Sequence, residues 1–152
     1  MKILFVCTGN TCRSSMAAAL ARHLLAERSW GPEEFLVASA GIAAVEGEPA
    51  SREAIQALAE MGVDLRGHRA AGLTAEDLAQ ADLVLTMTAW HRRHVQELHP
   101  GEAHKVFTLA DYARTEGDIP DPIGQPLQSY RATALRLKDL IDKALDRLEK
   151  EQ

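Results

Sequence analysis

The sequence has few cysteines and no long hydrophobic run, and both features exclude classes of protein. Only two cysteines occur in 152 residues, Cys7 and Cys12, and they lie close together in the chain. A secreted disulfide scaffold distributes its cysteines so that the bonds join distant segments, so we do not expect one here. No apolar run approaches the ~20 residues that a membrane-spanning helix needs. The N-terminus lacks a signal-peptide cleavage pattern, and the expected location is therefore cytoplasmic.

Basic residues are also in the minority. The chain has 17 Lys and Arg against 22 Asp and Glu, a formal net charge of −5. This balance argues against general binding of nucleic acid and against anionic membranes, so neither is an expected partner. The length and the 46% content of hydrophobic residues fit one domain, residues 1–152, which is large enough to form its own core.

The histidines and tryptophans do not predict a metal or cofactor site. His91 and His94 are three residues apart, but a solvated helix face explains that spacing better than metal binding, and no His-x-x-x-His pair has a nearby carboxylate. We expect no metal and no cofactor. His68 is expected to be a structural hydrogen-bonding residue, and Trp30 and Trp90 are expected to pack.

Short apolar runs alternate with helix-like segments along the chain. Strands are predicted at residues 2–6, 35–39, 81–87 and 105–109, and helices at about residues 16–25, 49–61, 88–98 and 127–149. Residues 29–32 should end the first helix, Thr74 and Asp77 predict the capped start of a short helix, and residues 110–126 should form a long loop.

This alternation predicts an α/β fold with a parallel sheet, right-handed crossovers and helices on both faces. Ligands of such folds bind beyond the carboxyl ends of the strands. The residues after the first strand and Asp121, which follows the fourth strand, are therefore expected on the same edge of the sheet.

A compact group of polar residues follows the first predicted strand. Residues 7–14 read Cys-Thr-Gly-Asn-Thr-Cys-Arg-Ser and lead directly into the first helix. A loop in this position can direct successive N–H groups toward one point and, with the helix N-terminus, bind an anion. Gly9 permits close approach, Asn10 tolerates a left-handed backbone, and Arg13 matches two phosphate oxygens. The segment therefore predicts a phosphate site.

Cys7 supplies this site with a candidate nucleophile. The ordinary pKa of a thiol is about 8.5, and a helix N-terminus with nearby cations lowers such values to roughly 3.5–7.5. Ser14 can donate a hydrogen bond to the thiolate, whose attack on phosphorus gives a phosphocysteine. Asp121 is the candidate proton donor to the leaving group and then the base for the hydrolytic water, with Asp118 as the competing carboxylate.

Each of these residues also has a purely structural explanation. A cysteine at a strand end is often a small buried hydrophobe, although the neighbouring Arg13 and Ser14 favour a nucleophile at position 7. Cys12 fits packing at the helix start as well as a reversible disulfide with Cys7 that protects it from over-oxidation. Asp121 also fits a turn in a proline-rich loop.

Several segments carry a family resemblance in the same order over nearly the whole chain. Residues 7–14, Ser39-Ala40-Gly41, Gly67-His68-Arg69, residues 81–87 and Asp121-Pro122 resemble the low-molecular-weight protein tyrosine phosphatases. The resemblance implies a four-stranded parallel sheet in the order 2-1-3-4, phosphorylated proteins as partners, and inorganic phosphate as product and inhibitor.

The resemblance also implies roles for individual residues. Cys7 matches the nucleophile, Arg13 the phosphate clamp and Asp121 the general acid. Ser14 matches the partner of the thiolate, and Cys12 the second, redox-protective cysteine. The phosphate-binding positions and the residues that hold the loop correspond to Thr8, Gly9, Asn10, Thr11, Cys12 and Arg13, with His68 as support.

Four departures from the tyrosine-specific pattern bear on the substrate. Thr11 replaces an aliphatic residue, Ile123-Gly124 replaces one or two aromatics, Val45 replaces a tryptophan and Thr88 replaces an aspartate. Thr11, Met87-Thr88, residues 105–109 and residues 121–124 are instead similar to the bacterial branch of protein arginine phosphatases.

The predicted function is therefore a protein phosphatase that acts on phosphotyrosine or phosphoarginine, and arginine dephosphorylation as the main activity is the alternative. A non-catalytic module that senses phosphate or redox state is the alternative of another class. Thioredoxin-coupled arsenate reductases share the loop but need further cysteines downstream, and this chain has none after Cys12.

Overall fold

Parallel strands form the centre of the molecule. The computed structural model describes residues 1–30 and 33–151. Within these residues the strands are β1 (Lys2–Cys7), β2 (Leu36–Gly41), β3 (Leu83–Thr86) and β4 (Val106–Thr108), all parallel and in the order β2-β1-β3-β4. The chain is thus a single-domain α/β protein, and the predicted strand order 2-1-3-4 is confirmed.

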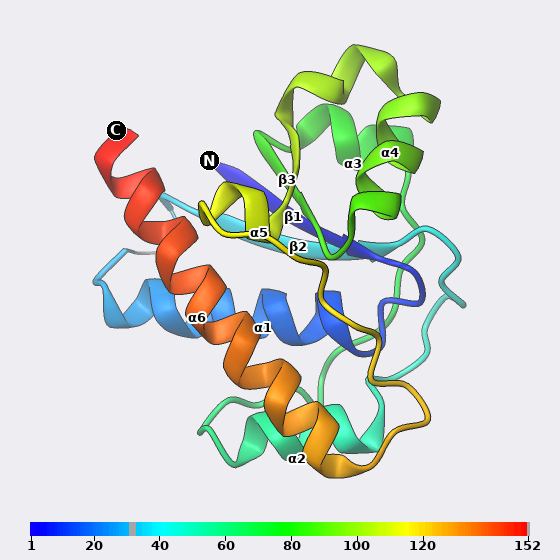
Figure 1. Cartoon of the computed structure of the whole chain (residues 1–152), viewed down its shortest axis with the longest axis vertical. Helices are drawn as coiled ribbons and strands as arrows, with labels where there is room; N and C mark the ends of the chain where they lie inside the picture. Colours follow the sequence, from blue (N-terminus) through cyan, green and yellow to red (C-terminus); the bar gives the residue numbers. More distant parts are fainter. Residues whose placement is uncertain (31–32, 152) are drawn as a thin grey trace.

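Helices cover both faces of this sheet, as Figure 1 shows. One face carries α1 (Arg13–Glu27), α2 (Arg52–Ala59) and α6 (Leu127–Glu151), and the other carries α3 (Ala75–Gln80) and α4 (Ala89–Leu98). The 3₁₀ helix η1 (Pro100–Lys105) and α5 (Leu109–Tyr112) flank β4 on either side in the sequence.

The sequence of β1 explains its central place. Ile3 and Phe5 belong to the large core under α1 and α6, whereas Leu4 and Val6 belong to the smaller core that includes residues of α3 and α4. Because a strand buried on both faces needs apolar side chains at every position, it appears in the sequence as a continuous hydrophobic run.

The strands also end at a common edge. Cys7 pairs with Gly41, Val6 with Thr86, and Thr86 with Thr108. The segments that follow the four strands therefore meet beyond the carboxyl ends of the sheet, which is where parallel α/β folds bind ligands.

Hydroxyl caps account for two differences from the predicted boundaries. Ser51 Oγ accepts a hydrogen bond from the Ala54 N–H at 3.3 Å, so α2 starts at Arg52 rather than at residue 49. Thr108 Oγ1 accepts from the Asp111 N–H at 3.0 Å and starts α5. The fourth strand is therefore shorter than predicted, and the loop predicted at 110–126 begins with a helical turn.

The other local predictions have mixed outcomes. The capping box of Thr74 and Asp77 is confirmed, with both hydrogen bonds at 3.0 Å. Helix α1 begins at Arg13, earlier than predicted, and ends at Glu27, before Ser29 takes a left-handed φ of 62°. Gly31 and Pro32, which were also predicted to end this helix, lie outside the described residues.

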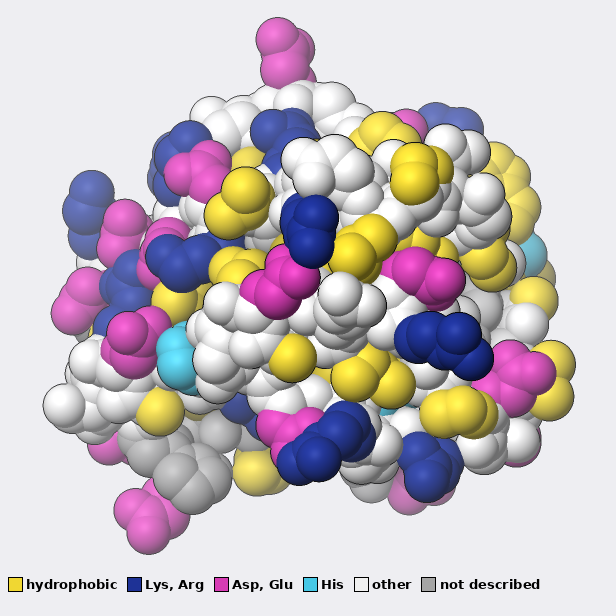
Figure 2. Space-filling view, turned by 90° about the horizontal axis from the view of Figure 1, so that it is seen from below, with side chains coloured by type: hydrophobic (Ala, Val, Ile, Leu, Met, Phe, Trp, Pro, Cys, Tyr) yellow, Lys and Arg dark blue, Asp and Glu magenta, His cyan; other side chains and the backbone are white. Residues whose placement is uncertain are grey.

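The surface mixes side chains of all kinds. Seen from the side of α2 and the start of α6, hydrophobic side chains are interspersed with acidic and basic ones (Figure 2).

None of the helices in residues 1–30 and 33–151 combines the length with the hydrophobicity of a membrane-spanning segment.

Candidate active site

The loop between β1 and α1 is held in one conformation by buried hydrogen bonds to Asn10. This residue is fully buried and has a left-handed φ of 59°. Its Nδ2 donates to Ser14 Oγ at 2.8 Å, and its Oδ1 accepts from the Ala71 N–H at 3.0 Å. His68 Nε2 lies 2.6 Å from the Asn10 carbonyl oxygen, and burial lowers the pKa of this histidine. The structure thus brings Asn10 and His68 together behind the loop.

Gly41 allows the loop to pack closely against the end of β2. A Cβ atom at this position would lie 2.4 Å from the Thr8 carbonyl oxygen and 3.1 Å from the Asn10 Cβ. Such contacts are far inside van der Waals distance, so only glycine fits here without moving the loop. A glycine that follows a strand in the sequence indicates a turn, whereas this packing role depends on the tertiary structure.

Cys7 lies at the base of a small cavity at the end of the sheet. The cavity has a volume of about 130 Å³ and is lined by Cys7, Thr8, Gly9, Asn10, Thr11, Cys12, Arg13, Asp121 and Ile123. Cys7 Sγ lies 2.8 Å from Ser14 Oγ. Because Ser14 Oγ already accepts from Asn10 Nδ2, the serine hydroxyl hydrogen is available to donate to the sulfur.

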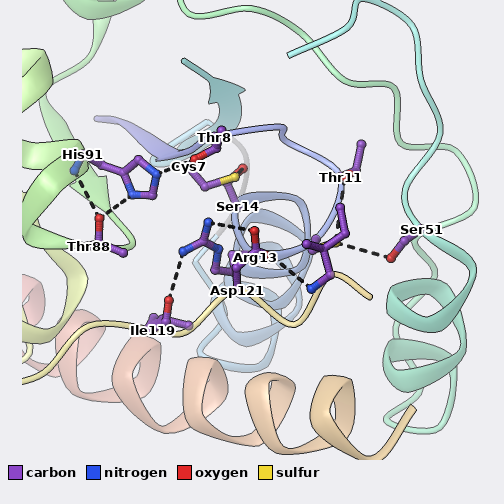
Figure 3. Close-up of polar contacts among 12 residues, drawn as sticks. Cys7, Thr8, Thr11, Arg13, Ser14, Ser51, Thr88, His91, Ile119 and Asp121 are labelled. Carbon is purple, nitrogen blue, oxygen red and sulfur yellow. Dashed lines mark hydrogen bonds and ion pairs between the residues drawn. The ribbon is translucent and has the colours of Figure 1, made fainter. Parts of the chain in front are cut away.

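Arg13 connects the loop to the segment that carries Asp121. The Arg13 side chain is buried, and its Nη1 donates to the Ile119 carbonyl oxygen at 3.0 Å (Figure 3). Its Nη2 lies 3.5 Å from Asp121 Oδ2. Residues more than a hundred positions apart in the sequence therefore meet at the cavity, on the edge of the sheet where they were expected.

The two carboxylates of this segment have different surroundings. Asp118 Oδ1 accepts a hydrogen bond from the Ala89 N–H at 2.9 Å and so stabilises the start of α4. Asp121 lines the cavity, its side chain is 44% exposed, and its Oδ1 accepts from the Ile123 N–H at 3.1 Å. Of the two, Asp121 is the one placed to reach a molecule in the cavity.

Cys12 lies at the start of α1 among polar side chains. Its Sγ is 3.5 Å from Ser51 Oγ and 3.8 Å from the Tyr130 hydroxyl. Burial raises the pKa of Tyr130 to about 12, so this residue is a neutral hydrogen-bonding partner. Cys7 and Cys12 are both buried free thiols and line the same cavity.

His91 is a residue of this site that the sequence analysis missed. The prediction that it lies on a solvated helix face is wrong, because the residue is 2% exposed. Its Nε2 lies 2.8 Å from Thr8 Oγ1 and its Nδ1 lies 2.8 Å from Thr88 Oγ1. Burial is the main cause that lowers the pKa of His91 to about 4, and the positive charge of Arg13 is the second cause.

The position of His91 relative to Thr88 is a sequence signal that could have predicted its orientation. Thr88 is the N-cap of α4 and accepts from the His91 N–H at 3.1 Å, so His91 occupies the third helical position. That is the position from which a glutamate reaches back to the cap in a capping box. The pattern predicts that the histidine turns toward the helix start rather than toward solvent.

Several apolar side chains are exposed. Ile123, which lines the cavity, is 61% exposed, and Val45 is 62% exposed. Trp90 is 53% exposed, so the prediction that it packs in the structure is wrong, although its ring stacks on His94 with centroids 5.1 Å apart. Trp30 is partly buried and stacks on Phe35, as a packing residue would.

The residues around the cavity do not form a set of metal ligands. Across residues 1–30 and 33–151, no three His, Cys, Asp or Glu side chains come together as candidate ligands. The chemistry that the cavity can support from its own residues is nucleophilic and acid–base chemistry on a bound anion.

Comparison with known proteins agrees with this geometry. Residues 2–152 match the family model described as "Low molecular weight phosphotyrosine protein phosphatase". A protein-arginine-phosphatase from Geobacillus stearothermophilus is 43% identical over 152 residues, which cover 99% of this chain and 98% of that protein. The low molecular weight protein-tyrosine-phosphatase PtpB of Staphylococcus epidermidis is 37% identical over 143 residues, covering 94% of this chain and 96% of that protein.

Solved structures have the same fold. A low molecular weight protein tyrosine phosphatase from T. tengcongensis superposes with a TM-score of 0.91 at 44% identity, covering 96% of this chain and 98% of that one. A cysteine-to-serine mutant of the arginine phosphatase YwlE, with a phosphorylated active-site serine, superposes with a TM-score of 0.92 at 38% identity and covers 100% of this chain and 98% of its own. The chain therefore belongs to the low molecular weight phosphotyrosine protein phosphatase family.

Proposed function

We propose that this protein is a cysteine-dependent phosphatase that removes phosphoryl groups from tyrosine or arginine side chains of proteins. The observation that carries this proposal is the convergence of Cys7, Arg13 and Asp121 on one small cavity. The membership of the family and the names of the relatives support the same reaction class. Retention of both Cys7 and Asp121 favours an enzyme over a sensor, because anion binding alone requires neither residue.

The first step is transfer of the phosphoryl group to Cys7. The N–H groups of the loop and the guanidinium of Arg13 hold the phosphoryl oxygens, and the Ser14 hydroxyl stabilises the thiolate at 2.8 Å. A bond forms between Cys7 Sγ and phosphorus while the bond from phosphorus to the leaving oxygen or nitrogen breaks. Protonated Asp121 gives its proton to the leaving atom.

The second step is hydrolysis of the phosphocysteine. The Asp121 carboxylate, left ionised by the first step, takes a proton from water as the water oxygen attacks phosphorus. The bond from sulfur to phosphorus breaks and the thiolate is restored. Inorganic phosphate leaves and, because it fits the same anion site, acts as an inhibitor.

Two buried thiols in one cavity also favour a reversible Cys7–Cys12 disulfide, which peptide mass analysis of the peroxide-treated protein would detect.

Arginine dephosphorylation as the main activity is the second candidate, and Thr11 favours it. Thr11 lines the cavity, and within residues 1–30 and 33–151 the hydrogen-bonding contact of its hydroxyl is a long one, 3.8 Å to Cys12 Sγ. It is therefore free to contact a polar group of the substrate, such as a guanidinium or a water that bridges to it. Ile123, which is exposed and lines the cavity, offers aliphatic rather than aromatic contact.

The two substrates also differ in how much acid catalysis they need. A phenolate has a conjugate acid with a pKa of about 10, whereas that of guanidine is about 12.5 or more. The harder leaving group makes phosphoarginine cleavage depend more strongly on protonation by Asp121. Both substrate classes appear among the named relatives, so identity alone does not choose between them.

The deciding experiment compares matched phosphotyrosine and phosphoarginine peptides with the wild type and Thr11→Ile. We expect Thr11→Ile to lower kcat/KM for phosphoarginine relative to phosphotyrosine by about tenfold, and Thr11→Ser to keep the wild-type ratio. An unchanged ratio in Thr11→Ile would exclude Thr11 as a specificity residue. Phosphopeptide binding by the wild type without any turnover would instead support the sensor.

A further inference from the structure

A chain of three hydrogen-bonded polar side chains, Thr88, His91 and Thr8, connects the start of α4 with the cavity. His91 lies in the middle, with Nε2 2.8 Å from Thr8 Oγ1 and Nδ1 2.8 Å from Thr88 Oγ1. Figure 3 shows the imidazole reaching from α4 toward Thr8. Thr8 is exposed and lines the cavity beside Cys7. The chain therefore ends at a hydroxyl that a bound molecule can touch.

His91 is neutral in the folded protein at neutral pH. Burial and the nearby charge of Arg13 bring its pKa to about 4. A neutral imidazole carries one N–H, so one ring nitrogen donates a hydrogen bond and the other accepts one. Two assignments of this hydrogen are possible, and they use the threonine hydroxyls differently.

The contacts of Thr88 distinguish the two assignments. Its Oγ1 already accepts the His91 backbone N–H at 3.1 Å. If Nδ1 carried the ring hydrogen, Thr88 Oγ1 would accept twice, and its own hydrogen would have no acceptor among the hydrogen bonds of the described residues. If Nε2 carries the ring hydrogen, Thr88 donates to Nδ1 and His91 donates to Thr8 Oγ1. Only the second assignment satisfies the Thr88 hydroxyl as well as both ring nitrogens within the protein.

This assignment leaves one hydrogen unused inside the protein, that of the Thr8 hydroxyl. Thr8 Oγ1 accepts from His91 and must direct its own hydrogen elsewhere, and the cavity adjoins it. We propose that His91 is a positioning residue, whose Nε2–H fixes the Thr8 hydroxyl as a hydrogen-bond donor to a phosphoryl oxygen of the substrate. This inference rests on the proposed phosphatase function.

Such a donor matters most in the transition state of phosphoryl transfer. The charge of the transferred group is then spread over three equatorial oxygens, and catalysis depends on donors that are already oriented toward them. A hydroxyl that rotates freely would have to be ordered during the reaction. A hydroxyl held by His91, itself held by the cap of α4, is ordered beforehand.

The test is a double-mutant cycle on Thr8 and His91. Thr8→Val removes the hydroxyl with little change of shape, and His91→Leu removes the ring nitrogens. Turnover of an aryl phosphate and inhibition by inorganic vanadate, which imitates the transition state, are measured together with Tm. We expect each variant to lower kcat and to weaken vanadate inhibition by roughly 10- to 100-fold. The double variant should lose no more than the single ones.

Two further variants separate positioning from simple structural support. His91→Gln places an amide N–H near the position of Nε2–H and is expected to recover most of the lost kcat. Thr108→Val removes a hydroxyl cap, that of α5, from a residue that does not line the cavity, and should leave kcat and vanadate inhibition unchanged. A fall in kcat that came from lower stability alone would also appear in Thr108→Val.

The outcomes are distinct from those that test the proposed function. Two results would overturn the role of His91 and leave the proposed phosphatase function intact. One is a double variant whose loss of kcat equals the sum of the two single losses on a free-energy scale. The other is a Thr8→Val variant with wild-type kcat and vanadate inhibition. Absence of turnover in the wild type would overturn the function itself. Loss of kcat in His91→Leu that tracks Tm and is not recovered by His91→Gln would reduce His91 to a structural residue.

Discussion

Arg13 Nη2 lies 3.5 Å from Asp121 Oδ2, so the start of α1 and the segment after α5 form an ion pair at the cavity. The same guanidinium donates to the Ile119 carbonyl at 3.0 Å. Arg13 is buried, and these contacts hold the Asp121 segment beside the loop between β1 and α1, residues 8–12, which is the proposed phosphate loop. The geometry explains how Asp121, the proposed proton donor, lies at the cavity although it is far from Arg13 in the sequence.

Replacement of Asp121 tests its proposed role as the acid. Asp121→Asn keeps the size of the side chain but has no proton to give at neutral pH, and we expect kcat to fall by about 10²- to 10⁴-fold. The loss should grow as the pKa of the leaving group rises, in a series of aryl phosphates. Asp118→Asn, which weakens only the contact to the start of α4, should show no such dependence. If the loss of kcat depended equally on the pKa of the leaving group in both variants, Asp121 would not be the acid.

The hydrogen bond between Ser14 and Cys7 should make the thiol more reactive, because it stabilises the ionised sulfur. Ser14→Ala removes this hydrogen bond, which is worth about 1.5–3 kcal/mol, so we expect alkylation of Cys7 at neutral pH to slow by roughly tenfold or more. The measurement is the rate of alkylation by iodoacetamide. Ser15→Ala is the matched control, because it removes a buried hydrogen bond to the Cys12 carbonyl in the same turn. A similar slowing in both variants would contradict the special role of Ser14.

Gly41 should be irreplaceable for a steric reason. In Gly41→Ala the new methyl group would stand 2.4 Å from the Thr8 carbonyl, so the phosphate loop must move. We expect a loss of stability of about 1–3 kcal/mol, typical of overpacking, together with a fall in kcat/KM. Gly101→Ala, where no atom lies within 4 Å of the added Cβ, should change neither Tm nor kcat/KM. Wild-type behaviour of Gly41→Ala would show that the loop does not need this close contact.

Burial of neutral His91 predicts a loss of stability in acid. The pKa is about 6.5 for an unfolded histidine and about 4 in the folded protein, so the unfolded chain binds more protons between these values. The contribution of His91 is therefore fully present above pH 6.5 and is lost as the pH falls toward 4, by about 3 kcal/mol in total.

The comparison of wild type with His91→Gln isolates this effect. The lowered pKa of His68 acts in the same direction but is common to both proteins. Denaturant unfolding at pH 7.5 and pH 4 should show a greater loss for the wild type than for the variant. An equal loss in the two proteins would mean that His91 titrates normally in the fold.

The phosphate loop was predictable from the sequence because its parts are contiguous. A strand, a glycine, an asparagine and an arginine at the start of a helix place a thiol and an anion site together by local geometry alone. The alternation of strands and helices predicted the parallel sheet. Its order came from the resemblance to a family, since periodicity does not say which strands are neighbours.

Tertiary contacts decided what the sequence left open. Asp118 and Asp121 are equivalent in the sequence of their loop, and only the structure shows that the first caps α4 while the second faces Arg13. Helical spacing placed His91 beside His94 without indicating that α4 starts against the phosphate loop. Buried His91 and exposed Trp90 are neighbours on one turn, and the packing of that turn determines which of them meets the loop.

The most direct test of the proposed reaction is detection of the phosphoryl group on Cys7. Asp121→Asn should slow hydrolysis of the intermediate, so this variant is mixed with a phosphopeptide and quenched within the first turnover, and the protein is digested for mass spectrometry. The proposed mechanism predicts phosphate on Cys7 in this variant and abolished turnover in Cys7→Ser. Turnover by Cys7→Ser at the wild-type rate, with no phosphate trapped on Cys7, would contradict it.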